Sequence, residues 1–383
     1  MPSTPVPAAG PAAVAARREA APGPPAVGMG WREDLVTAAL SAWLILGLFV
    51  DGWAHNTRPR LETFFTPWHA LFYSGFAALG AWVWWSVWRR WRRGTSLRAV
   101  VPPGYGLAVV GLALFLASGL GDMTWHLVFG IERSIAALLS PTHLGLFLGA
   151  LLAVTAPLRS AWAAPEGRAG LGRLLPAVLS ATLAGVLVAF MFQYLHPVYE
   201  NVVSLGHLDF LLDSFDAQQV GYVRELGVIA GIAGFLVATV TPFGPLVWMA
   251  RRWRLPAGAA LLVLGVQVLL MQAVTGFADA GLAALGVIGA ATVEGLVLLL
   301  RPGGQGQSWR VRAFALAAPA AFWGVYLAGI GLHGGGLGWA PELWGGALVW
   351  SSLTLLGVAA LAAPATTGES GGLKPSPPAL RGC

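Results

Sequence analysis

Ten apolar runs, each about long enough to cross a lipid bilayer, make up most of this chain between residues 35 and 362. A transmembrane α-helix needs roughly 20 apolar residues. Only 10% of the residues are charged, against roughly 25% in a soluble domain. We therefore predict an all-α, polytopic membrane bundle of about ten helices. The runs lie at 35–53, 68–88, 104–125, 141–158, 174–195, 225–249, 256–276, 280–300, 313–332 and 343–362.

The basic residues predict how the chain is oriented. If the N-terminus is cytoplasmic, most of the 23 Lys and Arg residues fall on the cytoplasmic side, as positively charged loops do. The exceptions are Arg58, Arg60, Arg133 and Arg224. Because topology explains the net charge of +6, no nucleic acid is expected as a partner. We predict a multi-pass protein of a prokaryotic plasma (inner) membrane with both termini cytoplasmic.

The two ends of the chain differ from the rest. Residues 1–30 are rich in Ala and Pro, and residues 363–383 are rich in Gly, Pro and Ser. Both are predicted to be disordered cytoplasmic tails. The single cysteine, Cys383, excludes intramolecular disulfides and sites made of several thiolates.

All seven histidines lie at or beyond the predicted extracytoplasmic helix ends. Histidines at a membrane boundary often serve metal or proton chemistry, so this sorting favours a functional cause. The histidines are His55, His69, His126, His143, His196, His207 and His333.

Four of these histidines belong to a repeated pattern. The first copy has Asp51 and His55 four residues apart, then Glu62, then Thr-Pro-x-His ending at His69. The second has Asp122 and His126, then Glu132, then Ser-Pro-x-His ending at His143. Each copy spans the outer turn of a helical hairpin. The pattern predicts a tandem repeat of hairpins, helices 1–2 and 3–4.

The spacing has a chemical meaning. Residues four apart share one face of a helix, so Asp51 and His55 can point at one place. Proline is favoured in the first turn of a helix, so Pro67 sets the start of the next helix and places His69 near its beginning. Two imidazoles and a carboxylate suit copper, zinc or iron. Three protein ligands leave positions open, as in catalytic metal sites.

We therefore predict metal sites at Asp51, His55 and His69 and at Asp122, His126 and His143. Glu62 and Glu132 either orient an imidazole from behind or are solvated loop acids. The alternative for both trios is a hydrogen-bonded network that joins the hairpins without any metal.

The first stretch, from "DGWAH" to "ETFFTPWHALFY", resembles the copper-ligand segment of the C subunit of particulate methane and ammonia monooxygenases. The resemblance implies that Asp51, His55 and His69 bind copper. The second trio falls where that family has a second proposed copper site, although Asp122 stands where the family usually has Asn. The likeness covers residues 51–76 and 122–147 only. No cupredoxin-like domain is present.

These observations predict a copper-binding membrane protein that oxidises a small substrate at an outward-side Asp/His/His site, as a monooxygenase subunit does. The alternatives are copper binding or transfer without turnover, and a zinc-dependent membrane hydrolase. Other membrane subunits or an electron donor are the expected protein partners. We expect a metal-binding region over 31–160 and a remaining bundle over 161–362 with an outer loop at 196–224.

Two further features are polar. Glu294 lies inside a predicted span, where an ionisable group suggests function or a hydrogen-bonded carboxylic acid between helices. Gln267 and Gln272 are expected to make hydrogen bonds between helices.

Overall fold

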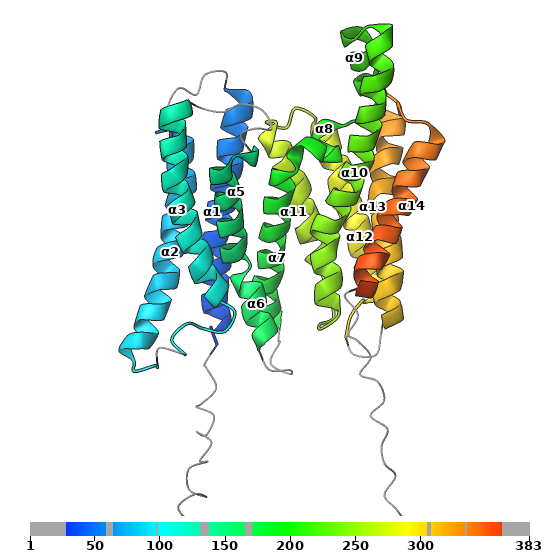
Figure 1. Ribbon diagram of the computed structural model, residues 1–383. Coiled ribbons are helices and arrows are strands. Elements are labelled where there is room, and N and C mark those ends of the chain that lie inside the picture. Colours follow the sequence, from blue (N-terminus) through cyan, green and yellow to red (C-terminus); the bar gives the residue numbers. More distant parts are fainter. Residues whose placement is uncertain are drawn as a thin grey trace, which may run out of the picture.

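The computed structural model describes residues 28–58, 64–96, 99–130, 138–164, 171–304, 308–333 and 335–361. Within these ranges the chain is helical, with a single isolated β-bridge between Ser204 and Leu337. The long helices stand side by side and run up and down in turn (Figure 1). They are α1 (Trp31–Thr57), α2 (Pro67–Arg92), α3 (Gly106–Phe129), α5 (Pro141–Val154), α6 (Ala156–Ala163), α7 (Leu171–Met191), α10 (Ala217–Ala250), α11 (Ala259–Val274), α12 (Ala280–Leu300), α13 (Ser308–His333) and α14 (Pro341–Leu361).

Every predicted span coincides with a helix. Nine helical segments in the described ranges are long and apolar enough to cross a membrane, with α5 and α6 together forming one of them. The tenth prediction, 256–276, is too long. The helix there, α11, covers only Ala259–Val274. Gly258, with φ of 87°, precedes it, so the first residues of that apolar run are not helical.

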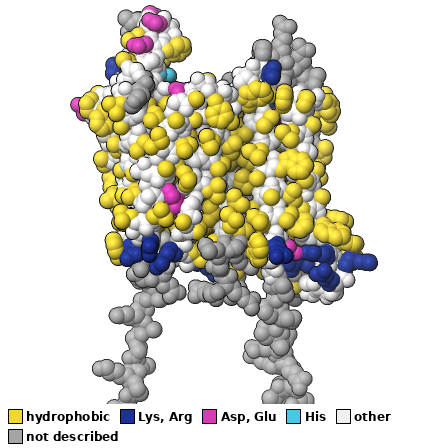
Figure 2. All heavy atoms as spheres, turned by 180° about the vertical axis from the view of Figure 1, so that it is seen from behind, with side chains coloured by type: hydrophobic (Ala, Val, Ile, Leu, Met, Phe, Trp, Pro, Cys, Tyr) yellow, Lys and Arg dark blue, Asp and Glu magenta, His cyan; other side chains and the backbone are white. Residues whose placement is uncertain are grey.

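The two ends of the bundle differ in charge. Arginines gather along one end below an apolar wall, as Figure 2 shows for one face. The histidines are at the other end: His55 in the last turn of α1, His69 in the first turn of α2, and the others likewise. The side of the membrane on which each end lies, and the tandem repeat of the two hairpins, are predictions from the sequence.

Close contact between helices holds each of the first two hairpins together. A Cβ on Gly75 of α2 would lie 2.7 Å from the Leu44 backbone of α1. Similarly, a Cβ on Gly149 of α5 would lie 2.7 Å from the carbonyl oxygen of Gly111 in α3. Small residues let membrane helices approach in this way. The backbone contact brings the ends of α1 and α2, and of α3 and α5, within reach of one another.

Two buried apolar clusters fill the bundle. The first is built mainly by α1, α2, α3 and α5, and the second mainly by α10 to α14. Helices α7 and α11 contribute to both clusters: Leu187 and Met271 to the first, Val178 and Leu264 to the second. They form the seam between the two groups of helices.

The predicted outer loop 196–224 is largely helical. A 3₁₀ turn at Gln193–Leu195, α8 (Pro197–Glu200) and α9 (Leu205–Ser214) precede α10, which begins at Ala217 and not near residue 225. Helix α9 and the start of α10 rise above the other long helices (Figure 1). The short α8 lies against the bundle, where Tyr326 donates to the Pro197 carbonyl oxygen at 2.6 Å.

Glu294 caps the N-terminus of α11. Its carboxylate, on α12, accepts hydrogen bonds from the backbone N–H groups of Gly258, Ala260 and Leu261 at 2.7, 3.0 and 3.2 Å. The first amides of a helix otherwise lack partners and favour a negative group. Of the two interpretations of Glu294, the contacts favour the hydrogen-bonded structural one.

Candidate metal centre

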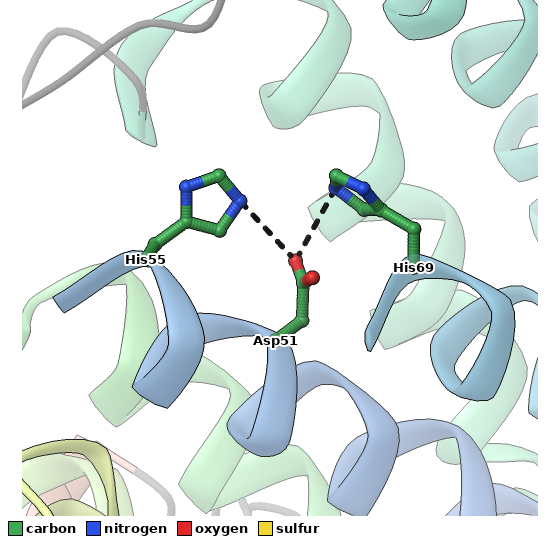
Figure 3. A group of neighbouring side chains, drawn as sticks. All are labelled: Asp51, His55 and His69. Carbon is green, nitrogen blue, oxygen red and sulfur yellow. Dashed lines mark ion pairs between the residues drawn. The ribbon is translucent and has the colours of Figure 1, made fainter. Parts of the chain in front are cut away.

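The first trio joins the end of α1 to the start of α2. In Figure 3 the imidazoles of His55 and His69 both point at the carboxylate of Asp51. Oδ2 of Asp51 lies 3.7 Å from Nε2 of His55 and 3.5 Å from Nε2 of His69. One candidate ligand atom from each residue lies within 4.8 Å of the others. The i,i+4 prediction for α1 and the placement of His69 after Pro67 are confirmed.

Local contacts fix the ring of His69. Thr66 caps α2 by accepting the backbone N–H of His69 at 3.1 Å. Nδ1 of the same ring lies 2.7 Å from the carbonyl oxygen of Phe64. A carbonyl oxygen only accepts, so Nδ1 carries a hydrogen. In the neutral ring, Nε2 then presents a lone pair toward Asp51. Metal-binding histidines are commonly oriented by such a bond on the other nitrogen.

A lone pair facing a carboxylate oxygen is unfavourable unless a proton or a metal cation lies between them. A charged N–H···O bond measures about 2.7–2.9 Å, which is shorter than either separation in this trio. Ligands about 2.0–2.2 Å from a tetrahedral metal lie roughly 3.3–3.6 Å apart. The spacing around Asp51 is therefore closer to that of a metal site than to that of an ion pair.

The second trio joins α3 to α5 in a similar way. Oδ1 of Asp122 lies 3.5 Å from Nε2 of His126 and 3.6 Å from Nδ1 of His143. Nδ1 of His126 faces the carbonyl oxygen of Gly130 at 3.1 Å, so its Nε2 also turns a lone pair to the carboxylate. Ser140 caps α5 and lies 2.6 Å from Nδ1 of His143. This group too could hold a metal ion.

The two carboxylates differ in their hydrogen bonds. Oδ1 of Asp51 is buried and has no hydrogen-bond partner among the described residues. Asp122 accepts from the Thr142 hydroxyl on Oδ1 at 3.1 Å and from Tyr73 on Oδ2 at 3.5 Å. Burying an unsatisfied carboxylate oxygen is costly. A bound cation would therefore stabilise the first trio more than the second.

The trios are neighbours, and two aromatic residues that the sequence analysis did not identify lie between them. The ring of Phe64 stacks on His69 at 4.9 Å and lies 6.0 Å from the ring of His126. Tyr73, one turn after His69 on α2, bonds to Asp122 and lies 6.4 Å from the His69 ring. The spacing of His69 and Tyr73 was the available signal, because residues four apart share a helix face.

Access to the first trio is greatest at His55. Its side chain is 29% exposed, against 8% for His69. A small molecule can therefore approach from the His55 side, at the end of the bundle. Glu62 and Glu132, predicted to orient imidazoles or to be solvated, lie outside the described residues.

Among the other histidines whose side chains the structure describes, His196 and His207 do not join either trio. His196 is buried, and burial lowers the pKa of its imidazole to about 3. Its Nδ1 accepts the Val198 N–H at 3.3 Å and its Nε2 lies 3.2 Å from the Gln267 amide. Gln272 donates to the Val198 carbonyl oxygen. Gln267 and Gln272 on α11 thus hydrogen-bond to the 196–198 segment, as predicted for glutamines that join parts of the bundle.

No family model matches this chain, and no curated protein or solved structure matches it either. The likeness to a copper-bearing subunit therefore rests on the two motif regions alone.

Proposed function

We propose that this protein is a membrane-embedded copper protein whose Asp/His/His trios bind the metal, with oxidation of a small substrate as its activity. One observation carries the proposal. Oδ2 of Asp51 lies 3.5 and 3.7 Å from two imidazole nitrogens, while its other oxygen is buried without a partner. A cation between Oδ2 and the two imidazoles would remove the repulsion among these acceptors. If both carboxylate oxygens contacted it, Oδ1 would also gain a partner.

The donor set and the resemblance together favour copper. Two imidazoles and one carboxylate also suit zinc and iron, so ligand type alone does not choose among them. The motif around residues 51–76 resembles a copper-ligand segment. Bound copper would supply one-electron chemistry with dioxygen, and the chain supplies the setting. Phe64 and Tyr73 lie between the two trios, and the partly exposed His55 leaves one side open to a small apolar or nitrogen substrate.

Metal analysis of the full-length purified protein tests the metal. We expect bound copper, with a Cu(II) electron paramagnetic resonance signal that shows nitrogen coupling. The double variant His69→Ala, His143→Ala should lose most of it. His207→Ala is the matched control, because His207 lies on α9 outside both trios, and it should bind copper as the wild type does. Stoichiometric zinc with no copper signal would favour the hydrolase alternative.

Oxygen uptake tests the activity separately. The copper-loaded protein, given a quinol as reductant and either ammonia or a short alkane, should consume oxygen only when the trios are intact. Copper binding without oxygen uptake, whatever the reductant and substrate, would leave binding or transfer as the function. Because monooxygenase subunits act in complexes, the assay should be made both on the purified chain and in native membranes that contain its partners.

A further inference from the structure

A large groove lies on the bundle far from the trios, where α7, α11 and α12 meet. Its volume is about 740 Å³, within the range of sites that hold small molecules. The lining is almost wholly apolar. It is formed mainly by residues 256–269, at the start of α11, together with Leu175 and Val178 of α7 and Val287 of α12.

Small residues on α11 create this hollow. A Cβ on Gly258 would meet nothing within 4 Å, and a Cβ on Gly265 would meet only Leu261 of its own helix, at 3.9 Å. Some other glycines of the bundle are instead pressed against a neighbouring helix, as Gly75 is against Leu44. At Gly265 no described part of the chain occupies the space that a side chain would fill.

The groove opens to the outside of the bundle. Leu175, Leu261 and Leu269 on its rim are 48%, 41% and 42% exposed. They belong to apolar helices of the membrane-spanning bundle. Whatever fills the groove therefore comes from the hydrocarbon phase of the bilayer.

The length of the groove matches one leaflet. Between Gly258 and Leu269 a helix rises about 16 Å. Half of the hydrocarbon core is about 15 Å thick. Because α11 begins at the arginine-rich end, the groove runs from that surface to about the middle of the bilayer. Its dimensions suit a single acyl chain better than a transmembrane helix, which would continue through the other leaflet.

Two arginines stand at the mouth. Arg254 lies two residues before Pro256, the first lining residue of this segment. The Leu255 N–H donates to the Pro302 carbonyl oxygen at 3.1 Å, which brings the backbone of Arg301 close to the same place. Both arginines are exposed, and neither forms an ion pair with a described residue. Basic groups beside a groove between membrane helices favour anionic lipid head groups.

We propose that this groove binds an anionic phospholipid, with one acyl chain against Gly265 and the phosphate beside Arg254 and Arg301. The site is independent of the metal trios and of the reaction proposed for them. It lies at the seam of the two buried clusters, because α7 and α11 contribute to both. A bound lipid would therefore stabilise the contact between the two groups of helices.

Native mass spectrometry of the delipidated full-length protein tests this site. We expect one dioleoyl phosphatidylglycerol to bind roughly 10- to 30-fold more tightly than dioleoyl phosphatidylcholine, given about a fivefold contribution from each arginine. Arg254→Gln together with Arg301→Gln should remove this preference. Gly265→Leu should abolish tight binding of both lipids, because its side chain would fill the groove.

Gly357→Leu is the matched control. Gly357 lies on α14, and a Cβ there also meets nothing within 4 Å, so the variant should bind lipid as the wild type does. Equal binding of phosphatidylglycerol by the wild type and Gly265→Leu would overturn the proposal. So would a lipid preference that survives the double arginine change. A wild-type dimer that Gly265→Leu converts to a monomer would assign the groove to a second copy of the chain instead.

Discussion

At the scale of single residues, the feature with the clearest energetic consequence is the carboxylate of Asp51. It is buried, one oxygen lacks a partner, and the other faces two imidazole nitrogens. In the metal-free protein this arrangement is destabilising, because acceptors face acceptors. The same arrangement is favourable once a cation occupies the space between them.

Asp51→Asn should therefore separate stability from metal binding. The amide can donate a hydrogen bond to Nε2 of His69 and carries no charge, so the chelated variant should gain about 1 kcal/mol of unfolding free energy. Its metal content should fall at the same time. Thermal unfolding after chelation, together with metal analysis, measures both quantities.

Asp122→Asn is the control for that change. Both oxygens of Asp122 already accept hydroxyl hydrogen bonds, from Thr142 and Tyr73, and an amide nitrogen cannot accept one. This variant should lose metal without gaining stability. If Asp51→Asn destabilised the chelated protein, or kept all of its metal, the assignment of the first trio would be wrong.

The six trio residues could be predicted from the sequence, because their i,i+4 spacing and the proline before each second helix have direct geometric meaning. Phe64 could not be, since its stacking on His69 and its approach to His126 depend on the folded structure, and the available signal for Tyr73 was its position four residues after His69. Glu294 illustrates the opposite difficulty. A carboxylate within an apolar run suggests function, and only the position of the neighbouring helix start identified it as a cap.

At the scale of elements, the trios depend on how closely two helices approach. Each trio draws residues from both arms of a hairpin, and in each hairpin a glycine lies against the backbone of the partner helix. Gly75 follows His69 on α2, and Gly149 follows His143 on α5, at the same distance along the sequence. The backbone contact is therefore part of what sets the spacing of the ligand atoms.

Adding one methyl group at these glycines should disrupt one trio at a time. Gly75→Ala would place a Cβ 2.7 Å from the Leu44 backbone, and such overpacking costs about 1–3 kcal/mol. It should lower metal binding at the first trio only. Gly149→Ala should affect only the second. Metal content and the resonance signal of each variant give the readout.

Gly80→Ala is the matched control on α2. Its nearest neighbour would be Leu112 Cδ2 at 4.0 Å, so the methyl group has room. Alanine favours a helix over glycine by up to about 1 kcal/mol. The control should be as stable as the wild type or more so, and should keep its metal. Equal loss of metal in Gly80→Ala and Gly75→Ala would show that helix spacing is not the cause.

At the scale of the whole molecule, the two ends of the bundle are chemically distinct. Arginines gather at one end (Figure 2), and the histidines lie at helix ends on the other side of the bundle. The positive-inside rule predicts that the arginine end is cytoplasmic and therefore that the trios face the extracytoplasmic side. Nine of the ten predicted spans correspond to described helical segments long and apolar enough to cross a membrane, so these could be predicted from hydropathy. The shortness of α11 could not be predicted, because a glycine with a left-handed backbone inside an apolar run does not change the hydropathy of that run.

The single cysteine offers a direct test of this orientation. Cys383 is the last residue and follows α14, whose end lies at the arginine-rich end. A membrane-impermeant maleimide should label it in inverted membrane vesicles and leave it unlabelled in intact cells. Moving the thiol to the other end, with His207→Cys in a Cys383→Ser background, should reverse the pattern. Labelling of Cys383 in intact cells would invert the topology.

The carboxylate of Glu294 on the first amides of α11 bears on how the chain enters a membrane. Taken alone, α11 is a short helix with bare N–H groups, and α12 is a hydrophobic segment carrying an uncompensated acid. Unpaired N–H groups and an isolated carboxylic acid are both costly in hydrocarbon. In the folded chain the carboxylate of Glu294 accepts from the first N–H groups of α11, which satisfies both. We therefore expect α11 and α12 to enter the membrane together, as one unit.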